Sequence, residues 1–126
     1  MDQTTCMAID DDAIFLRKLS VFIDDIDWLS LKHTYTNSVK GATALISNKP
    51  DLLFLDMEMP HAGGGYLMDW LEPKINEMEP KPKVIIVTSL EASSIEGLPN
   101  VTGYINKFDL KSSEVLEGRL KEILGS

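Results

Sequence analysis

The sequence has a single cysteine and no long apolar run, and each of these shortages excludes a class of protein. Cys6 cannot form an internal disulfide, so we expect a small buried thiol in a reducing compartment. No apolar run approaches the ~20 residues that a membrane-spanning helix needs, and the N-terminal residues lack the basic and then apolar pattern of a signal peptide. These absences predict a cytoplasmic protein that makes no membrane contact.

Basic residues are also scarce, since 12 Lys and Arg stand against 20 Asp and Glu, for a formal net charge of −8. Nucleic-acid binding depends on a basic surface that neutralises phosphates, so we expect no direct nucleic-acid binding. With 126 residues, 44% of them hydrophobic, the chain can bury about two-thirds of its unfolded surface without metal or disulfide support. We therefore expect one domain, residues 1–126.

Short apolar segments alternate with amphipathic segments along the whole chain. The strands are expected at 5–9, 29–36, 52–56, 83–87 and 102–105, and the helices at 13–26, 37–47, 63–77, 91–97 and 112–124. Pro73 is expected to kink or divide the third helix. Because a strand buried on both faces reads as a continuous apolar run, as in KVIIV at 83–87, the pattern predicts an α/β fold. We expect a flavodoxin-like, doubly wound, five-stranded parallel sheet with strand order 2-1-3-4-5.

Reactive polar residues follow four of the five predicted strands, and folds of this class bind ligands at the carboxyl ends of their strands. These residues are Asp10 and Asp11 after the first strand, Asp56 after the third, Thr88 after the fourth, and Asn106 and Lys107 after the fifth. Four such placements on one sheet edge predict a functional site there.

The chemistry of that edge favours phosphoryl transfer. Three carboxylates about 5 Å apart would repel by roughly 3 kcal/mol per pair at an effective dielectric constant of about 20. A cation and the ammonium of Lys107 would offset this repulsion, and oxygen ligands with bound water suit Mg²⁺. With Asp56 as the nucleophile, Lys107 would balance charge on the phosphoryl oxygens and Thr88 would donate a hydrogen bond.

Four motifs in this order resemble the response-regulator receiver domains of two-component signalling: IDDD from Ile9, LDMEMP from Leu55, VTS from Val87 and GYINK from Gly103. The resemblance implies that Asp56 is the phosphoacceptor and that Thr88 and Tyr104 form a switch. It also implies that Asp11 and Asp56 ligate Mg²⁺ directly, that Asp10 acts chiefly through a metal-bound water, and that the backbone carbonyl of Glu58 completes the protein ligands.

The same resemblance implies a signalling phosphoacceptor and not a turnover enzyme. The phosphodonor would be a histidine kinase or a phosphotransfer protein, and the output would be another domain, a downstream protein or a homodimer. LDMEMP and the preceding segment DDIDWLSLKHTYTN are similar to receivers joined to LytTR-type DNA-binding domains. Two departures from the family pattern stand out. Phe108 replaces the proline that commonly follows the lysine, so we expect a trans Lys107–Phe108 peptide bond, and the helix at 91–97 is short.

Two other classes of protein use some of the same residues. Haloacid-dehalogenase-type phosphatases use similar residues, but their nucleophile lies on the first strand, whereas here the acidic pair comes first. A pseudo-receiver, which would bind partners without phosphorylation, should lack Asp56, Thr88 or Lys107, and all three are present. Asp12 is expected to cap the first helix and not to bind metal, and His33 is expected to face solvent.

Overall fold

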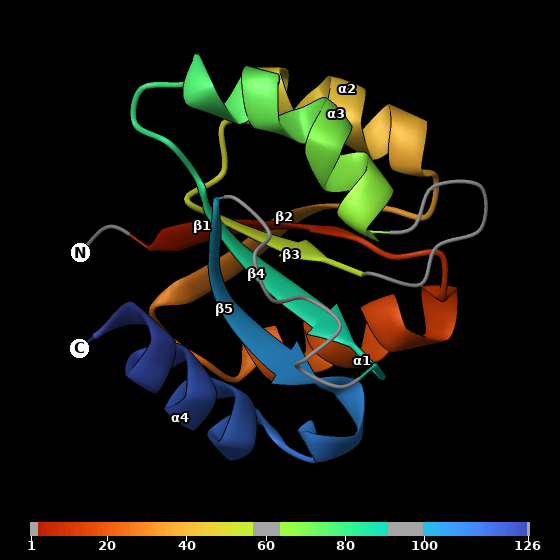
Figure 1. Cartoon of the computed structure of the whole chain (residues 1–126). Coiled ribbons are helices and arrows are strands. Elements are labelled where there is room, and N and C mark those ends of the chain that lie inside the picture. The colour runs from red at the N-terminus through yellow and green to blue at the C-terminus, as the bar shows by residue number, and fades with distance from the viewer. Residues whose placement is uncertain (1–2, 57–63, 91–99, 126) are drawn as a thin grey trace.

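Five parallel strands form one sheet at the centre of the molecule (Figure 1). The computed structural model of the chain describes residues 3–56, 64–90 and 100–125, and only the backbone of residues 64–68 and 70. The strands are β1 (Thr4–Ile9), β2 (Leu29–Tyr35), β3 (Leu52–Leu55), β4 (Lys83–Thr88) and β5 (Val101–Asn106), and their order is β2-β1-β3-β4-β5. The predicted fold class and strand order are confirmed.

Helices cover both faces of the sheet. Figure 1 shows α2 (Ser38–Asn48) and α3 (Gly64–Asn76) on one face and α1 (Ala13–Asp24) and α4 (Ser113–Leu124) on the other. A short 3₁₀ turn, η2 (Lys107–Asp109), follows β5. The helix expected at 91–97 lies outside the described residues. No helix in the described part of the chain is long and apolar enough to cross a bilayer.

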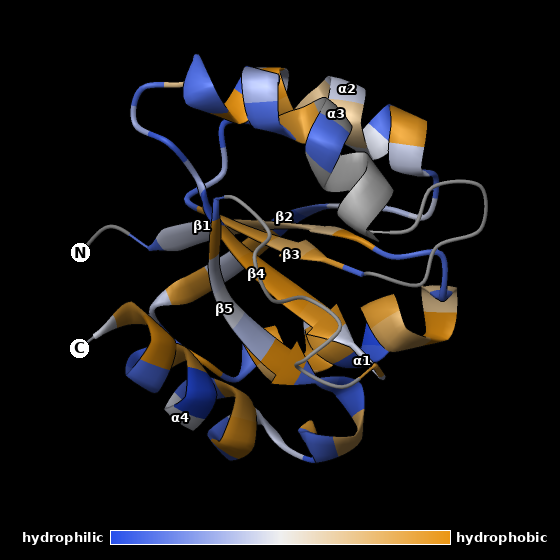
Figure 2. Ribbon diagram, viewed as in Figure 1, coloured by the Kyte–Doolittle hydropathy of each residue, from blue (hydrophilic) through white to orange (hydrophobic). Residues whose placement is uncertain are grey.

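The core consists of two hydrophobic clusters, one on each face of the sheet, because successive side chains of a strand point to opposite faces. Ala8, Phe54 and Val87 belong to the cluster under α1 and α4. Their chain neighbours Ile9 and Leu55 belong to the cluster under α2 and α3. In Figure 2 the central strands are accordingly among the most hydrophobic parts of the ribbon. All four residues of β3 are buried, as its continuous apolar run predicted.

Local hydrogen bonds explain where the helices begin. The side chain of Asp12 accepts from the backbone N–H groups of Ile14 (3.0 Å) and Phe15 (3.1 Å), and so caps α1 as predicted. Asn37 caps α2 and Ser112 caps α4 in the same way. Cys6 is buried and His33 is exposed, both as predicted.

Pro73 does not divide the third helix. The helix α3 continues through Pro73 to Asn76, so of the two predicted outcomes, a kink or a division, the division does not occur. Pro73 removes only one N–H group, and it lies in the last turn of the helix. Leu71 and Ile75, which flank it, are fully buried and pack in the core. This packing on both sides of the proline holds the last turn helical.

Candidate functional site

The register of β1 and β3 brings two aspartates side by side. Ile9 and Leu55 are paired across the two strands, and the next residues are Asp10 and Asp56. Oxygen atoms of Asp10, Asp11 and Asp56 all lie within 4.8 Å of one another. Asp10 and Asp56 are 3% and 2% exposed, whereas Asp11 is exposed. The strand ends therefore form an acidic cluster with two buried members and one at the surface.

Lys107 reaches this cluster from the end of β5. Its Nζ lies 2.8 Å from Asp10 Oδ2 and 3.6 Å from Asp56 Oδ2. The same Nζ lies 4.5 Å from the centroid of the Phe15 ring, a cation–π contact from α1. One ammonium is thus shared by two buried carboxylates and an aromatic face. The sequence pattern did not reveal the contact of Phe15 with Lys107, because the apolar spacing of Phe15 marks it only as a core residue.

The charges in the cluster do not balance. Burial raises the pKa of Asp10, although hydrogen bonds from Lys107 and from the Asp12 amide oppose this shift. Burial alone would lower the pKa of Lys107, but its hydrogen bond to Asp10 and the charges of Asp10 and Asp56 outweigh burial and raise that pKa. Lys107 therefore stays charged. Three carboxylates still face one ammonium, and this oxygen-rich cluster could hold a metal ion.

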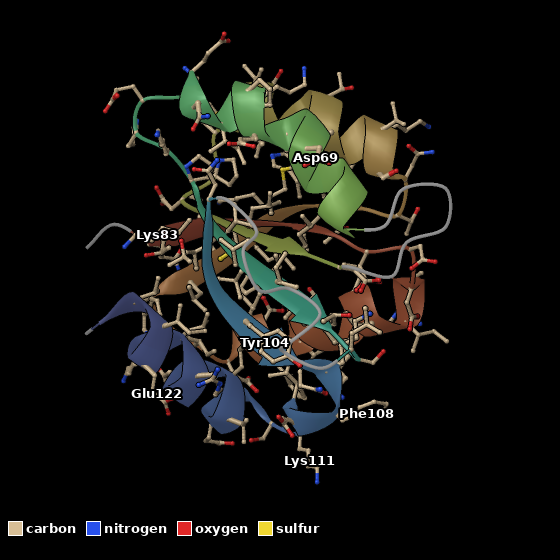
Figure 3. All side chains as sticks on the ribbon, in the orientation of Figure 1. Asp69, Lys83, Tyr104, Phe108, Lys111 and Glu122 are labelled. Atoms are coloured by element: carbon tan, nitrogen blue, oxygen red, sulfur yellow. The ribbon has the colours of Figure 1, made fainter. Side chains whose placement is uncertain are left out.

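Thr88 and Tyr104 meet at one backbone segment on the other face of the sheet. Thr88 is fully buried at the end of β4, and its Oγ1 accepts from the N–H of Leu90 at 3.3 Å. The hydroxyl of Tyr104, which is half-buried on β5 (Figure 3), donates to the carbonyl oxygen of Leu90. The two residues expected to form a switch are thus joined through Leu90. Glu58, whose carbonyl was expected to bind metal, lies outside the described residues.

Asn106 has contacts that the sequence did not reveal. Its Nδ2 donates to the Tyr104 hydroxyl at 3.0 Å, and its Oδ1 accepts from the N–H of Phe108 at 2.8 Å. The Lys107–Phe108 peptide bond is trans, as predicted. Phe108 is 73% exposed and points away from the sheet in Figure 3. Only its position at a strand end marked Asn106 in the sequence.

Known proteins share this sequence pattern and fold. The model of the response regulator receiver domain matches residues 6–107. The transcriptional regulatory protein BtsR of Escherichia coli is 25% identical over 118 residues, which are 94% of this chain and 45% of that protein. An uncharacterized response regulatory protein of Vibrio parahaemolyticus is 28% identical over 105 residues, which are 83% of this chain and 39% of that protein. The chain thus spans less than half the length of these two relatives.

Solved structures agree on the fold. The response regulator domain of Thermotoga maritima CheB superposes with a TM-score of 0.77 at 22% identity, and the match covers 98% of this chain and 95% of that one. Salmonella typhimurium RcsB gives a TM-score of 0.82 at 18% identity, and covers 100% of this chain and 63% of that one. At such identities the likeness supports the fold alone. Because the family model spans residues 6–107, most of the chain, the protein belongs to the response regulator receiver domain family.

Proposed function

We propose that the chain, acting as one receiver domain over residues 1–126, accepts a phosphoryl group on Asp56 from a phosphohistidine of a kinase or a phosphotransfer protein. The observation that carries this proposal is the placement of Asp56. Its carboxylate is buried within a cluster of three and lies 3.6 Å from the ammonium of Lys107. A carboxylate that served only as a turn or surface residue would not be buried beside two others.

In the proposed reaction an oxygen of Asp56 attacks phosphorus and the imidazole nitrogen of the donor leaves, so that an O–P bond replaces an N–P bond. Lys107, already 2.8 Å from Asp10, offsets charge on the phosphoryl oxygens, and the Thr88 hydroxyl donates a hydrogen bond to one of them. Mg²⁺, held by Asp11 and Asp56, by Asp10 through water and by the carbonyl of Glu58, would neutralise further oxygen charge. The donor set fits this ion because it consists only of oxygen atoms.

Phosphorylation would act as a switch because it adds negative charge to a buried edge of the sheet. The added charge draws Thr88 and Lys107 inward. Tyr104 follows Thr88, because both residues are hydrogen-bonded to the backbone of Leu90. The surface formed by β4 with the helix expected at 91–97 and by β5 with α4 then changes its affinity for an output domain, a downstream protein or a second copy of the chain. We propose that this signalling takes place in the cytoplasm. We also propose that the chain is related to the receivers that are joined to LytTR-type DNA-binding domains.

Intact-mass measurement after incubation with acetyl phosphate and Mg²⁺ tests the proposal. We expect one added phosphoryl mass on the wild type and none on Asp56→Asn. The control variant Asp27→Asn also removes one carboxylate, but at an exposed position outside the acidic cluster, and should be labelled like the wild type. Equal labelling of Asp56→Asn would refute the proposal, and no labelling of the wild type would favour the pseudo-receiver.

A further inference from the structure

Asn106 lies where the two faces of the site meet. Tyr104 and Asn106 are two residues apart on β5, so their side chains share a face, and Tyr104 packs against the cluster under α2 and α3. Ile105 points to the opposite face, as does Lys107, whose Nζ contacts Phe15 of α1. The chain therefore passes from the face of the switch residues to the face of the acidic cluster between Asn106 and Lys107.

Both ends of the Asn106 side-chain amide are used, and its orientation follows from its partners. Oδ1 must face the N–H of Phe108, at 2.8 Å, because an N–H needs an acceptor. Nδ2 then faces the hydroxyl of Tyr104 at 3.0 Å and the carbonyl oxygen of Leu90 at 3.5 Å. Asn106 is also the register partner of Thr88 across β4 and β5. One side chain thus contacts the turn that carries Lys107 and the segment bound by Thr88 and Tyr104.

Beyond the contacts of the Lys107 ammonium itself, the residue that follows Lys107 does little to hold the start of its turn in the described part of the chain. Residue 108 is a phenylalanine and not a proline, and its side chain is 73% exposed, so neither a proline ring nor packing of residue 108 fixes the turn. The far end is fixed, because Leu110 is 1% exposed and its N–H donates to the carbonyl of Lys107. Asn106 Oδ1 therefore acts as the cap of the turn.

We propose that Asn106 is a positioning residue that couples the Tyr104 hydroxyl to the position of the Lys107 ammonium over Asp56. When Tyr104 moves, the amide of Asn106 moves with it, and the cap on the Phe108 N–H shifts the start of the turn. Lys107 then changes its position between Asp10 and Asp56. This inference rests on the proposed phosphorylation of Asp56, since it assigns a means of regulation to that site.

The test measures the rate of phosphoryl incorporation from acetyl phosphate with Mg²⁺ for Asn106→Leu, Tyr104→Phe and the double variant. Each single change removes the hydrogen bond between Asn106 and Tyr104, and the loss of that shared bond should slow incorporation by about fivefold. The double variant should be no slower than the slower single variant, because both changes break the same connection. If Asn106 had a merely structural role, the rate losses of the two single variants would instead multiply in the double variant.

Asn106→Ser separates the cap from the coupling. A serine hydroxyl can still accept from the Phe108 N–H, but it is too short to reach Tyr104. This variant should keep the melting temperature close to that of the wild type and yet show the rate loss of Asn106→Leu. It also keeps the test decisive if Asn106→Leu does not fold.

A second asparagine–tyrosine pair in the chain supplies the matched control. Asn48 Nδ2 donates to the Tyr35 hydroxyl at 3.1 Å, outside the acidic cluster. Asn48→Leu and Tyr35→Phe should leave the incorporation rate unchanged. If the wild type is labelled and Asn106→Ser reacts at the wild-type rate, or if the losses at 104 and 106 multiply, the coupling is overturned while the proposed function stands. If the wild type is not labelled, the proposed function itself fails.

Discussion

Replacing Lys107 with methionine removes the only ammonium that contacts the two buried carboxylates in the described part of the chain. At an effective dielectric constant of about 20, the attraction of Nζ for Asp10 at 2.8 Å is roughly 6 kcal/mol, and for Asp56 at 3.6 Å roughly 5 kcal/mol. Much of this gain offsets the cost of burying the three charges. We expect Lys107→Met to lower the free energy of unfolding by ~3 kcal/mol without metal, which corresponds to a melting temperature lower by about 10 °C.

Mg²⁺ should stabilise Lys107→Met more strongly than it stabilises the wild type. Without the ammonium, the carboxylates of Asp10, Asp11 and Asp56 attract a divalent cation with no competing positive charge. Mg²⁺ at a hundred times its dissociation constant stabilises the protein that binds it by ~2.7 kcal/mol. The difference in stability between Lys107→Met and the wild type should therefore narrow as Mg²⁺ is added.

Urea unfolding followed by circular dichroism, in EDTA and across a Mg²⁺ titration, measures both effects. Lys121→Met is the matched control, because Lys121 Nζ lies 3.8 Å from Glu117 and its side chain is 54% exposed. Its loss should change stability by about 0.5 kcal/mol or less. The reasoning is refuted if Lys107→Met is as stable as this control in EDTA, or if Mg²⁺ widens the difference from the wild type.

Three further predictions concern the framework of the site. Asp12→Ala should lower the free energy of unfolding in urea by ~1 kcal/mol, because two N–H groups of α1 lose their acceptor. An unchanged free energy of unfolding would contradict the capping role of Asp12. Burial raises the pKa of Cys6 to about 12, so iodoacetamide should alkylate this thiol only in urea, as seen by intact mass. Because the folded-state pKa is raised, the stability from the protonated thiol is full below about pH 9 and is lost as the pH rises toward about 12. Gly103→Ala should lower the free energy of unfolding by about 1 to 3 kcal/mol, because its Cβ would clash with Ile123 Cγ2, and adding Ile123→Ala should recover part of this loss in a thermal melt.

Much of the fold follows from the sequence because each element carries its own local signal. The run from Leu52 to Leu55 is apolar at every position, as a central strand must be, and Asp12 and Ser112 are good helix caps. The end of α1 was harder to predict. Ile26 continues the apolar spacing and is buried, yet the helix ends at Asp24, because a turn also delivers Ile26 to the core.

The polar contacts of the site depend on geometry that the sequence does not contain. The pairing of Ile9 with Leu55 explains why Asp10 and Asp56 become neighbours, and strand order alone predicted that. That Lys107 lies closer to Asp10 than to Asp56 depends on the rotamers of a long side chain. The role of Asn106 depends on a loop residue, Leu90, that is distant from it in sequence.

Backbone hydrogen bonds prevent the carboxylates of the acidic cluster from moving apart. The N–H of Asp10 donates to the carbonyl of Tyr35 at 3.0 Å, and the N–H of Asp56 donates to the carbonyl of Ile9 at 3.1 Å. The two aspartates are therefore held by the same sheet that buries Ile9 and Leu55, and they cannot separate without breaking these bonds. Repulsion that cannot relax by movement can be relieved by nearby positive charge or by protonation, which the raised pKa of Asp10 favours. The rigidity of the sheet thus keeps the two carboxylates close enough to attract the ammonium of Lys107 together, and a looser junction of β1 and β3 would weaken that attraction.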